Sequence, residues 1–506
     1  MMLKRFISIF LCAVLCACAL PLLALADEES SQTPVLPSSP ELVAGYAAVA
    51  YCVEYDQFLL EDRIDETVAP CVAAKLVTGM VVYDIVKEQG LSIDTLEVTV
   101  SAEAVSTAGN VIDIRVPILG LRAESVYYCK DLLQSLFVAS ANDAATTLAD
   151  FFGTEYLGGG TPAFVARMNE KCDELGLTKT RFTHPAGLDE TGQYSTPREV
   201  ALIAAAFYKY DELVKLSDVA SFSLKKVDST GGGSTVINKN YLKNNKYVAG
   251  YLNKNAIGII AGQNTINGDY CLITATQKDG ISYIFVVMCA PSLIVESDAE
   301  GKKTYRFDDV NAYTEMTKII DWARSSFRIC DVADPSVMVA ELRVEIGVSD
   351  HVMIVPREKV SKLVLFVEGV ELETKIDFDT ELVYKTENNG STVDTVKAPI
   401  KKNQKVGTIT YSYNGETIAV VDAVARDNVD SNAAKSIFDT VKGILFSKTA
   451  IIILCVIGGI IVLYALFALT MWIIRLVKKL KGDTKPKKKK KKVKPVDENA
   501  TTRELK

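Results

Sequence analysis

The sequence predicts an α+β domain followed by a small all-β domain and a single C-terminal transmembrane helix. Residues 42–335 mix apolar, strand-like runs with segments of helical length. Residues 336–427 change to short alternating segments separated by Gly, Asn and Asp turns. Residues 450–474 carry no charged side chain. A chain of 506 residues is also too long for one compact domain.

The N-terminus has the pattern of a secretory signal. Two basic residues precede an apolar run over residues 6–25, and the small residue Ala26 precedes an acidic segment. We therefore predict a signal peptide over residues 1–26. Residues 27–41 are rich in Glu, Ser and Pro, too polar to order themselves, and are predicted to be a linker.

The elements of the two domains follow from their apolar patterns. In the first domain we predict strands over residues 46–51 and 281–288 and helices over residues 73–88, 130–151 and 161–175. In the second domain we predict strands over residues 342–346, 351–354, 362–367, 406–413 and 417–421.

The C-terminal third ends in a predicted membrane anchor. A polar, partly amphipathic stalk over residues 428–448 leads into a transmembrane helix over residues 449–474. At about 1.5 Å per residue, the uncharged stretch is long enough to cross a hydrocarbon core of ~30 Å. The tail, residues 475–506, is rich in lysine, which places it in the cytoplasm. The chain is thus predicted to be a single-pass protein of the cell membrane with its large domain extracytoplasmic.

Composition excludes several classes of function. The net charge is −7 although the tail contains fourteen Lys or Arg and four Asp or Glu, so the folded body is acidic and nucleic acid is not a predicted partner. The chain has two histidines, and its eleven cysteines do not have metal-ligand spacing. We therefore predict no metal, no cofactor and no histidine-based catalytic triad.

A degenerate nucleophile motif opens the first predicted helix. In a Ser-x-x-Lys motif the two side chains share one helix face, so the lysine can take the serine's proton. Here Lys75 is present, but Val72 occupies the serine position and has no proton to give. Cys71 is adjacent and is the one candidate for a substitute nucleophile, although a shift of one residue rotates a side chain by about 100° around the helix.

A second motif, Ser140-Ala141-Asn142, makes the resemblance specific. Together with residues 164–169, 175–177, 180–188 and 194–197, it resembles the low-molecular-mass penicillin-binding proteins, the serine-type D-alanyl-D-alanine carboxypeptidases. The resemblance implies a β-lactamase/DD-peptidase-like fold. It also implies that Ser140 matches the proton-shuttling serine of this family and Asn142 the asparagine that holds the substrate amide.

The third family motif, Lys-Thr-Gly on an edge strand, aligns with Ile260-Ala261-Gly262. Only Gly262, a substrate-binding position in the family, is kept. In the family the lysine meets the terminal carboxylate of the substrate and the threonine donates a hydroxyl, and Ile260 and Ala261 do neither. The β domain resembles the C-terminal module of the same family as well.

Three hypotheses follow. The first is a catalytically inactive carboxypeptidase-like cell-wall protein, a pseudoenzyme that binds peptidoglycan stem peptides or a protein partner. The second is an active D-Ala-D-Ala carboxypeptidase that trims stem peptides with an atypical nucleophile. The third is a membrane scaffold or sensor that acts through its lysine-rich tail. Loss of a serine nucleophile lowers the rate about a millionfold, which favours the first hypothesis.

Overall fold

The computed structural model describes residues 38–43, 45–108, 118–188, 192–263, 268–298, 300–388 and 390–481. The predicted signal peptide, most of the predicted linker and residues 482–506 of the tail lie outside these ranges. The chain divides into two compact units. The first runs to Val332 and also includes Val360–Glu373 and Ser412–Ile418, and the second contains the remaining residues from Ala333 onward.

A five-stranded antiparallel sheet forms the centre of the first unit, with the order β2-β1-β9-β8-β7. Its two faces bury alternate residues of each strand: Val49 of β1 packs in one apolar cluster and Ala48 in the other. A strand buried on both faces needs apolar side chains at every position, which explains its uninterrupted apolar sequence. The strands are β1 (Ala47–Cys52), β2 (Gln57–Asp62), β7 (Ile257–Gln263), β8 (Tyr270–Lys278) and β9 (Ile281–Ala290).

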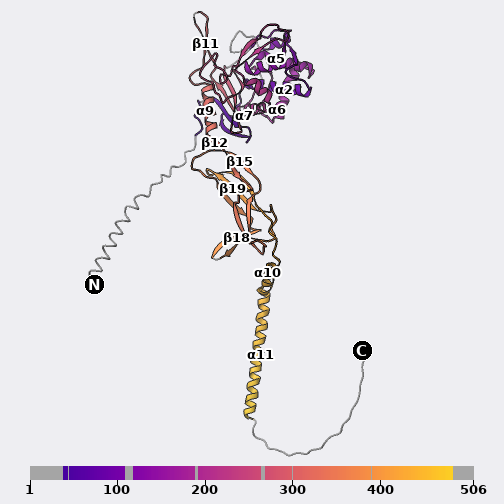
Figure 1. The fold of residues 1–506 in the computed structure, drawn as a ribbon, viewed down its shortest axis with the longest axis vertical. Coiled ribbons are helices and arrows are strands. Elements are labelled where there is room, and N and C mark those ends of the chain that lie inside the picture. The colour runs from indigo at the N-terminus through magenta and orange to yellow at the C-terminus, as the bar shows by residue number, and fades with distance from the viewer. Residues whose placement is uncertain are drawn as a thin grey trace, which may run out of the picture. The chain divides into compact units, whose positions relative to one another are not determined.

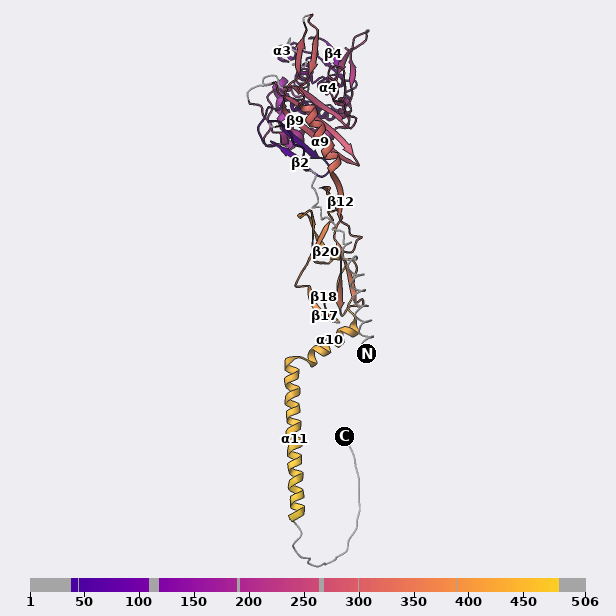
Figure 2. The same cartoon turned by 90° about the vertical axis from the view of Figure 1, so that its left-hand side faces the viewer.

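Helices cover both faces of this sheet, and this arrangement confirms the predicted α+β class. On one side α9 (Ala312–Ser326) packs through Tyr313, Met316 and Ile320. On the other side lies a layer of several helices (Figures 1 and 2). These are α2 (Ala73–Glu88), α3 (Ala102–Thr107), α4 (Cys129–Val138), α5 (Asn142–Glu155), α6 (Gly160–Glu174), α7 (Pro197–Tyr208) and α8 (Asp211–Ser217).

Four two-stranded sheets complete the first unit. They pair β3 (Glu97–Thr99) with β4 (Val126–Tyr128), β5 (Ser221–Leu224) with β6 (Ser234–Ile237), β10 (Ile294–Ser297) with β11 (Lys303–Arg306), and β12 (Phe327–Ala333) with β15 (Val360–Leu365). The hairpin of β5 and β6 is the one that borders the candidate site.

The predicted helix over residues 130–151 is two helices, α4 and α5, with a break at Ala139–Ala141. Ser140 has a φ of 53°, in the left-handed region that an α-helix cannot include. The sequence here has no Gly or Pro to announce the break. The fold imposes this break. Because of the break, the Ser140 side chain does not take the direction that a continuous helix would give it.

The second unit contains a seven-stranded sheet with the order β16-β19-β20-β14-β13-β18-β17. The strands are β13 (Ala340–Glu345), β14 (His351–Pro356), β16 (Glu373–Phe378), β17 (Val383–Asn388), β18 (Ser391–Lys397), β19 (Lys405–Tyr413) and β20 (Glu416–Ala425). Two helices follow, α10 (Ala433–Leu445) and α11 (Lys448–Lys481). Within α11, Ile451–Leu480 is long and apolar enough to cross a membrane.

Close packing between α2 and α4 gives a test of the core. A methyl group added at Gly79 of α2 would overlap the ring of Phe137 in α4, whereas one added at Gly443 of α10 meets nothing within 4 Å. We expect Gly79→Ala to lower the free energy of unfolding by about 1–3 kcal/mol because both groups lie in a packed core. Urea unfolding of the full chain in detergent measures the change. Gly443→Ala, the matched control, should leave the midpoint unchanged or raise it slightly.

Candidate active site

The three motif positions predicted from the sequence meet at one place in the first unit. An ideal Cβ built on Gly262 of β7 would lie 2.7 Å from Cγ1 of Val72 and 3.0 Å from Oγ of Ser140. These positions are separated by up to 190 residues in the chain. Only glycine fits at position 262, since any side chain would push the other two residues apart.

Val72 ends the turn that leads into α2. Cys71, the residue before it, has a φ of 47°, and the turn is closed by the amide of Ala73 donating to the carbonyl of Pro70. The Val72 side chain is 1% exposed and packs within the apolar core. The nucleophile position is therefore filled by an isopropyl group that fits its surroundings.

Lys75 lies in the first turn of α2 and is buried. Its Nζ donates a 2.8 Å hydrogen bond to the carbonyl of Ala186. Burial lowers the pKa of Lys75 to about 8, an effect opposed by nearby Cys71 and reinforced by nearby Lys239. A buried cation without a carboxylate partner is energetically unfavourable, and this lysine is kept although its serine partner is absent.

The turn at residues 184–187 holds Lys75 in place. Thr78 of α2 donates a 2.8 Å hydrogen bond to the carbonyl of Pro185. Gly187 has a φ of 66°, and a Cβ there would overlap the carbonyl of Cys71. His184 accepts a hydrogen bond from the amide of Ala186 at 3.1 Å, and burial together with the charge of Lys75 lowers the pKa of His184 to about 4.

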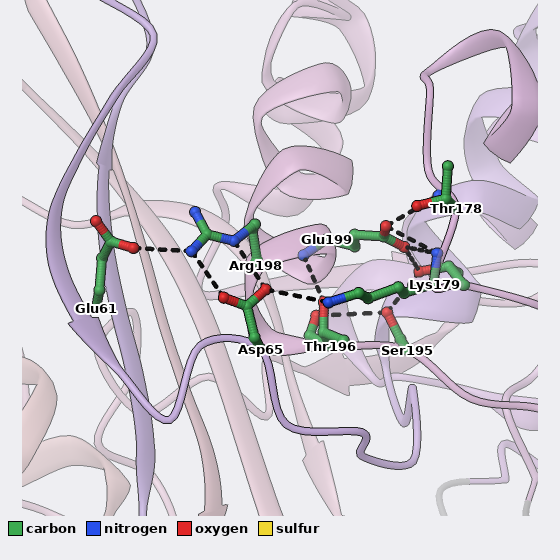
Figure 3. Close-up of polar contacts among 9 residues, drawn as sticks. Glu61, Asp65, Thr178, Lys179, Ser195, Thr196, Arg198 and Glu199 are labelled. Carbon is green, nitrogen blue, oxygen red and sulfur yellow. Dashed lines mark hydrogen bonds and ion pairs between the residues drawn. The ribbon is translucent and has the colours of Figure 1, made fainter.

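A polar network fixes the segment before and after this turn (Figure 3). The carboxylate of Glu199 in α7 accepts hydrogen bonds from the amides of Thr178 and Lys179 at 2.9 Å. Its neighbour Arg198 pairs with Asp65 and with Glu61 of β2. The network thereby joins α7 to β2 and to the segment that precedes the turn at residues 184–187, which contacts Lys75.

Ser140 and Asn142, the residues predicted for the second motif, each bury a polar side-chain atom. Within the part of the chain that the structure describes, Oγ of Ser140 and Nδ2 of Asn142 are buried without a hydrogen bond. Such a group costs about 1–3 kcal/mol. Together with the positive φ of Ser140, this strain is typical of a functional site rather than of a stability device.

The third motif lies on β7, at the edge of the sheet. Ile259 has a φ of 68° at a register shift between β7 and β8, which is strained for a β-branched residue. After this bulge, Ile260 faces the helical layer and Ala261 the layer of α9. The position of the family's lysine is thus occupied by a buried apolar side chain that points towards the site.

The same unit also contains a cavity of about 520 Å³. Among the described residues its lining includes Ala139, next to Ser140, and three lysines, Lys225, Lys226 and Lys239, and no Asp or Glu. Among the described residues none of the three lysines forms an ion pair. Burial lowers the pKa of Lys239. The remaining lining comes from residues 118–121, Tyr127, Leu224, Ser229, residues 232–237 and Tyr247.

The sequence prediction missed Lys239. Two buried asparagines hold it in place: Nδ2 of Asn238 donates to the carbonyl of Val219 at 2.7 Å, and Nδ2 of Asn240 to that of Gly258 at 3.1 Å. A lysine between two asparagines in a segment of few charges was a signal available in the sequence. Its closeness to Lys75 depends on tertiary structure alone.

Comparisons with known proteins decide the family. The model of the D-alanyl-D-alanine carboxypeptidases, peptidase family S11, matches residues 34–292, and the model of the penicillin-binding protein 5 C-terminal domain matches residues 334–431. The chain belongs to the D-alanyl-D-alanine carboxypeptidase family. The resemblance predicted from the sequence is therefore confirmed for both domains.

Individual relatives cover most of the chain. It is 26% identical over 428 residues to D-alanyl-D-alanine carboxypeptidase DacF of Bacillus subtilis, covering 84% of this chain and 95% of the relative. DacC of Escherichia coli is 26% identical over 80% of this chain and 88% of its own length. Among solved structures, DacD of Francisella tularensis has a TM-score of 0.57 at 22% identity, covering 80% of this chain and 99% of that chain, which supports the fold.

The burial of Lys75 gives a prediction about stability. Because folding lowers its pKa from 10.5 to about 8, the unfolded chain binds more protons between these values, and stability should rise with pH across that window. Below pH 8 the charged lysine destabilises the fold by roughly 3 kcal/mol. We expect Lys75→Met to raise the free energy of unfolding at pH 7 by about 1–3 kcal/mol in urea titrations. The exposed Lys254→Met is the control, and a destabilised Lys75→Met variant would contradict this account.

His184 gives a second prediction about stability, at acidic pH. Its pKa falls from 6.5 to about 4 on folding, so its stabilising contribution is complete above pH 6.5 and is lost as pH falls towards 4. We expect the wild type to lose roughly 3 kcal/mol more over this window than His184→Asn, whose amide oxygen can accept the same hydrogen bond. Thermal or urea unfolding at pH 7 and pH 4.5 tests this, and parallel losses in the two proteins would refute it.

Proposed function

We propose that this protein is a non-hydrolysing member of the carboxypeptidase family that binds peptidoglycan stem peptides at the cell surface. In this proposal the cleft retains recognition of the peptide and has lost the covalent step. The membrane helix anchors the chain once in the cell membrane, with the large domain extracytoplasmic and the lysine-rich tail cytoplasmic.

Loss of the covalent step rests on the residues at the nucleophile position. Acyl transfer needs a group that can be deprotonated and can attack a carbonyl, and Val72 has neither property. Lys75 stays beside it and donates to Ala186. Cys71 lines a different cavity from the one that contains Lys239 and Ala139, so its thiol is not aimed at the same ligand.

Retention of recognition rests on one observation, the cluster of three lysines that form no ion pair with a described residue in the cavity of about 520 Å³. The body of the chain is acidic, so a cavity whose described charged lining residues are all lysines supports an anionic ligand. Stem peptides that end in D-Ala-D-Ala carry a terminal carboxylate. Lys239, which lies near Lys75, is placed to meet that carboxylate in the absence of the third-motif lysine.

Binding and hydrolysis can be measured on the same sample. Calorimetry of the full chain in detergent with an acetylated pentapeptide ending in D-Ala-D-Ala should show saturable binding, and an assay for free D-alanine should show no release above background. We expect Lys239→Ala to weaken binding about tenfold or more, since a charge-assisted hydrogen bond contributes about 1.5–3 kcal/mol. Binding should also weaken as the pH rises towards the lowered pKa of Lys239.

The control is Lys254→Ala, an exposed lysine of the same unit that lies outside the cavity lining. It should bind as the wild type does. Equal affinity of Lys239→Ala and wild type would remove the proposed role of the lysine cluster. Release of D-alanine by the wild type would overturn the non-hydrolysing function itself.

A further inference from the structure

Three cysteines from distant parts of the chain line a second cavity, of about 280 Å³. Cys71 comes from the turn before α2, Cys271 from β8 and Cys289 from β9. Cys271 lies opposite Gly262 in the pairing of β7 with β8, and Gly262 in turn lies against Val72. The register of the sheet therefore brings Cys271 beside the residue that precedes Val72.

Cys71 and Cys271 are in direct contact, with the Cys271 thiol donating a hydrogen bond to the sulfur of Cys71. Cys289 affects Cys271 by charge alone. Cys289 has a φ of 59°, and the pairing of β8 with β9 shifts register after Tyr270. Cys271 therefore has no directly paired residue in β9. Cys71 is therefore the better-placed partner. Within the described ranges, no group of three or more His, Cys, Asp or Glu residues is arranged to hold a metal ion.

We propose that Cys71 and Cys271 form a disulfide bond that fastens the degenerate nucleophile turn to the central sheet. The proposal uses the extracytoplasmic placement given above, because disulfides persist in oxidising compartments. The bridge would join positions 200 residues apart. It would hold Val72 against Gly262 and remove Cys71 as a nucleophile.

The bond forms by thiol–disulfide exchange with a disulfide oxidant. The Cys71 thiolate, which lies near the ammonium of Lys75, attacks one sulfur of the oxidant, forms a mixed disulfide and displaces one thiolate. Cys271 then loses its proton to water and attacks the Cys71 sulfur, and the mixed disulfide breaks to release the second thiolate. The two cysteines lose two electrons and two protons in total, and the oxidant is reduced to two thiols.

The second attack is the slow one in the folded protein. The hydrogen bond to Cys71 and burial both raise the pKa of Cys271, so its thiolate is scarce near neutral pH. In a reduced, folded sample, closure of the bridge by oxidised glutathione should therefore accelerate as the pH is raised. Cys129 and Cys172, whose pKa values burial also raises, lie outside this cavity and should stay free thiols.

The test is a disulfide map of the full chain. Cells are treated with N-ethylmaleimide at harvest, and the chain is purified, digested without reductant and analysed by mass spectrometry. We expect a peptide pair that links Cys71 to Cys271. The pair should persist in Cys289→Ser and be lost in both Cys71→Ser and Cys271→Ser. Reductant should lower the thermal midpoint of the wild type and of Cys289→Ser by about 10 °C, and should not change that of the Cys71→Ser/Cys271→Ser double variant.

Two results would overturn the proposal. One is N-ethylmaleimide on both Cys71 and Cys271 of the wild type, with no link formed after incubation with oxidised glutathione. The other is a link between Cys271 and Cys289. Both readings come from the wild-type protein, so they do not depend on whether a variant folds, and neither bears on whether the lysine-lined cavity binds a peptide.

Discussion

The packing of the α2 turn against β7 is the constraint on which the rest of the site depends. Gly262 has no room for a side chain because Val72, in the turn before α2, and Ser140, in the break between α4 and α5, lie against it. The turn before α2 is also held by Gly187, which lies against the carbonyl of Cys71. The left-handed Ser140 and the bulge at Ile259 thus lie in the same part of the fold as Val72, whose side chain has no group that could act as a nucleophile.

The retained polar groups are costly in a protein that, in our proposal, performs no acyl transfer. Lys75 is buried without a carboxylate, and Ser140 and Asn142 bury polar atoms without partners among the described residues. Strain of this kind is maintained where it serves a function. In our proposal that function is recognition of a carboxylate by Lys239, Lys225 and Lys226, in the cavity that Ala139, the neighbour of Ser140, also lines.

The sequence was sufficient for the residues that stand in local motifs. The spacing of Lys75 from Val72, the pair Ser140 and Asn142, and Gly262 are each read from neighbours in the chain, and the fold brings Val72, Ser140 and Gly262 together. The roles of Lys75, Ser140 and Asn142 stay predictions. The sequence was not sufficient for features that depend on burial or on strand register. The break of the helix at Ser140 follows from packing, since no Gly or Pro marks it, and the approach of Lys239 to Lys75 follows from the fold.

Covalent labelling with a fluorescent penicillin tests the central claim most directly, because penicillin acylates the nucleophile of this family without needing the natural peptide. The full chain in detergent, shown to be folded by its thermal transition, should carry no label after denaturing electrophoresis, and Cys71→Ser should behave in the same way. A stable adduct on the wild type would contradict the account, and its loss in Cys71→Ser would identify the thiol as the nucleophile.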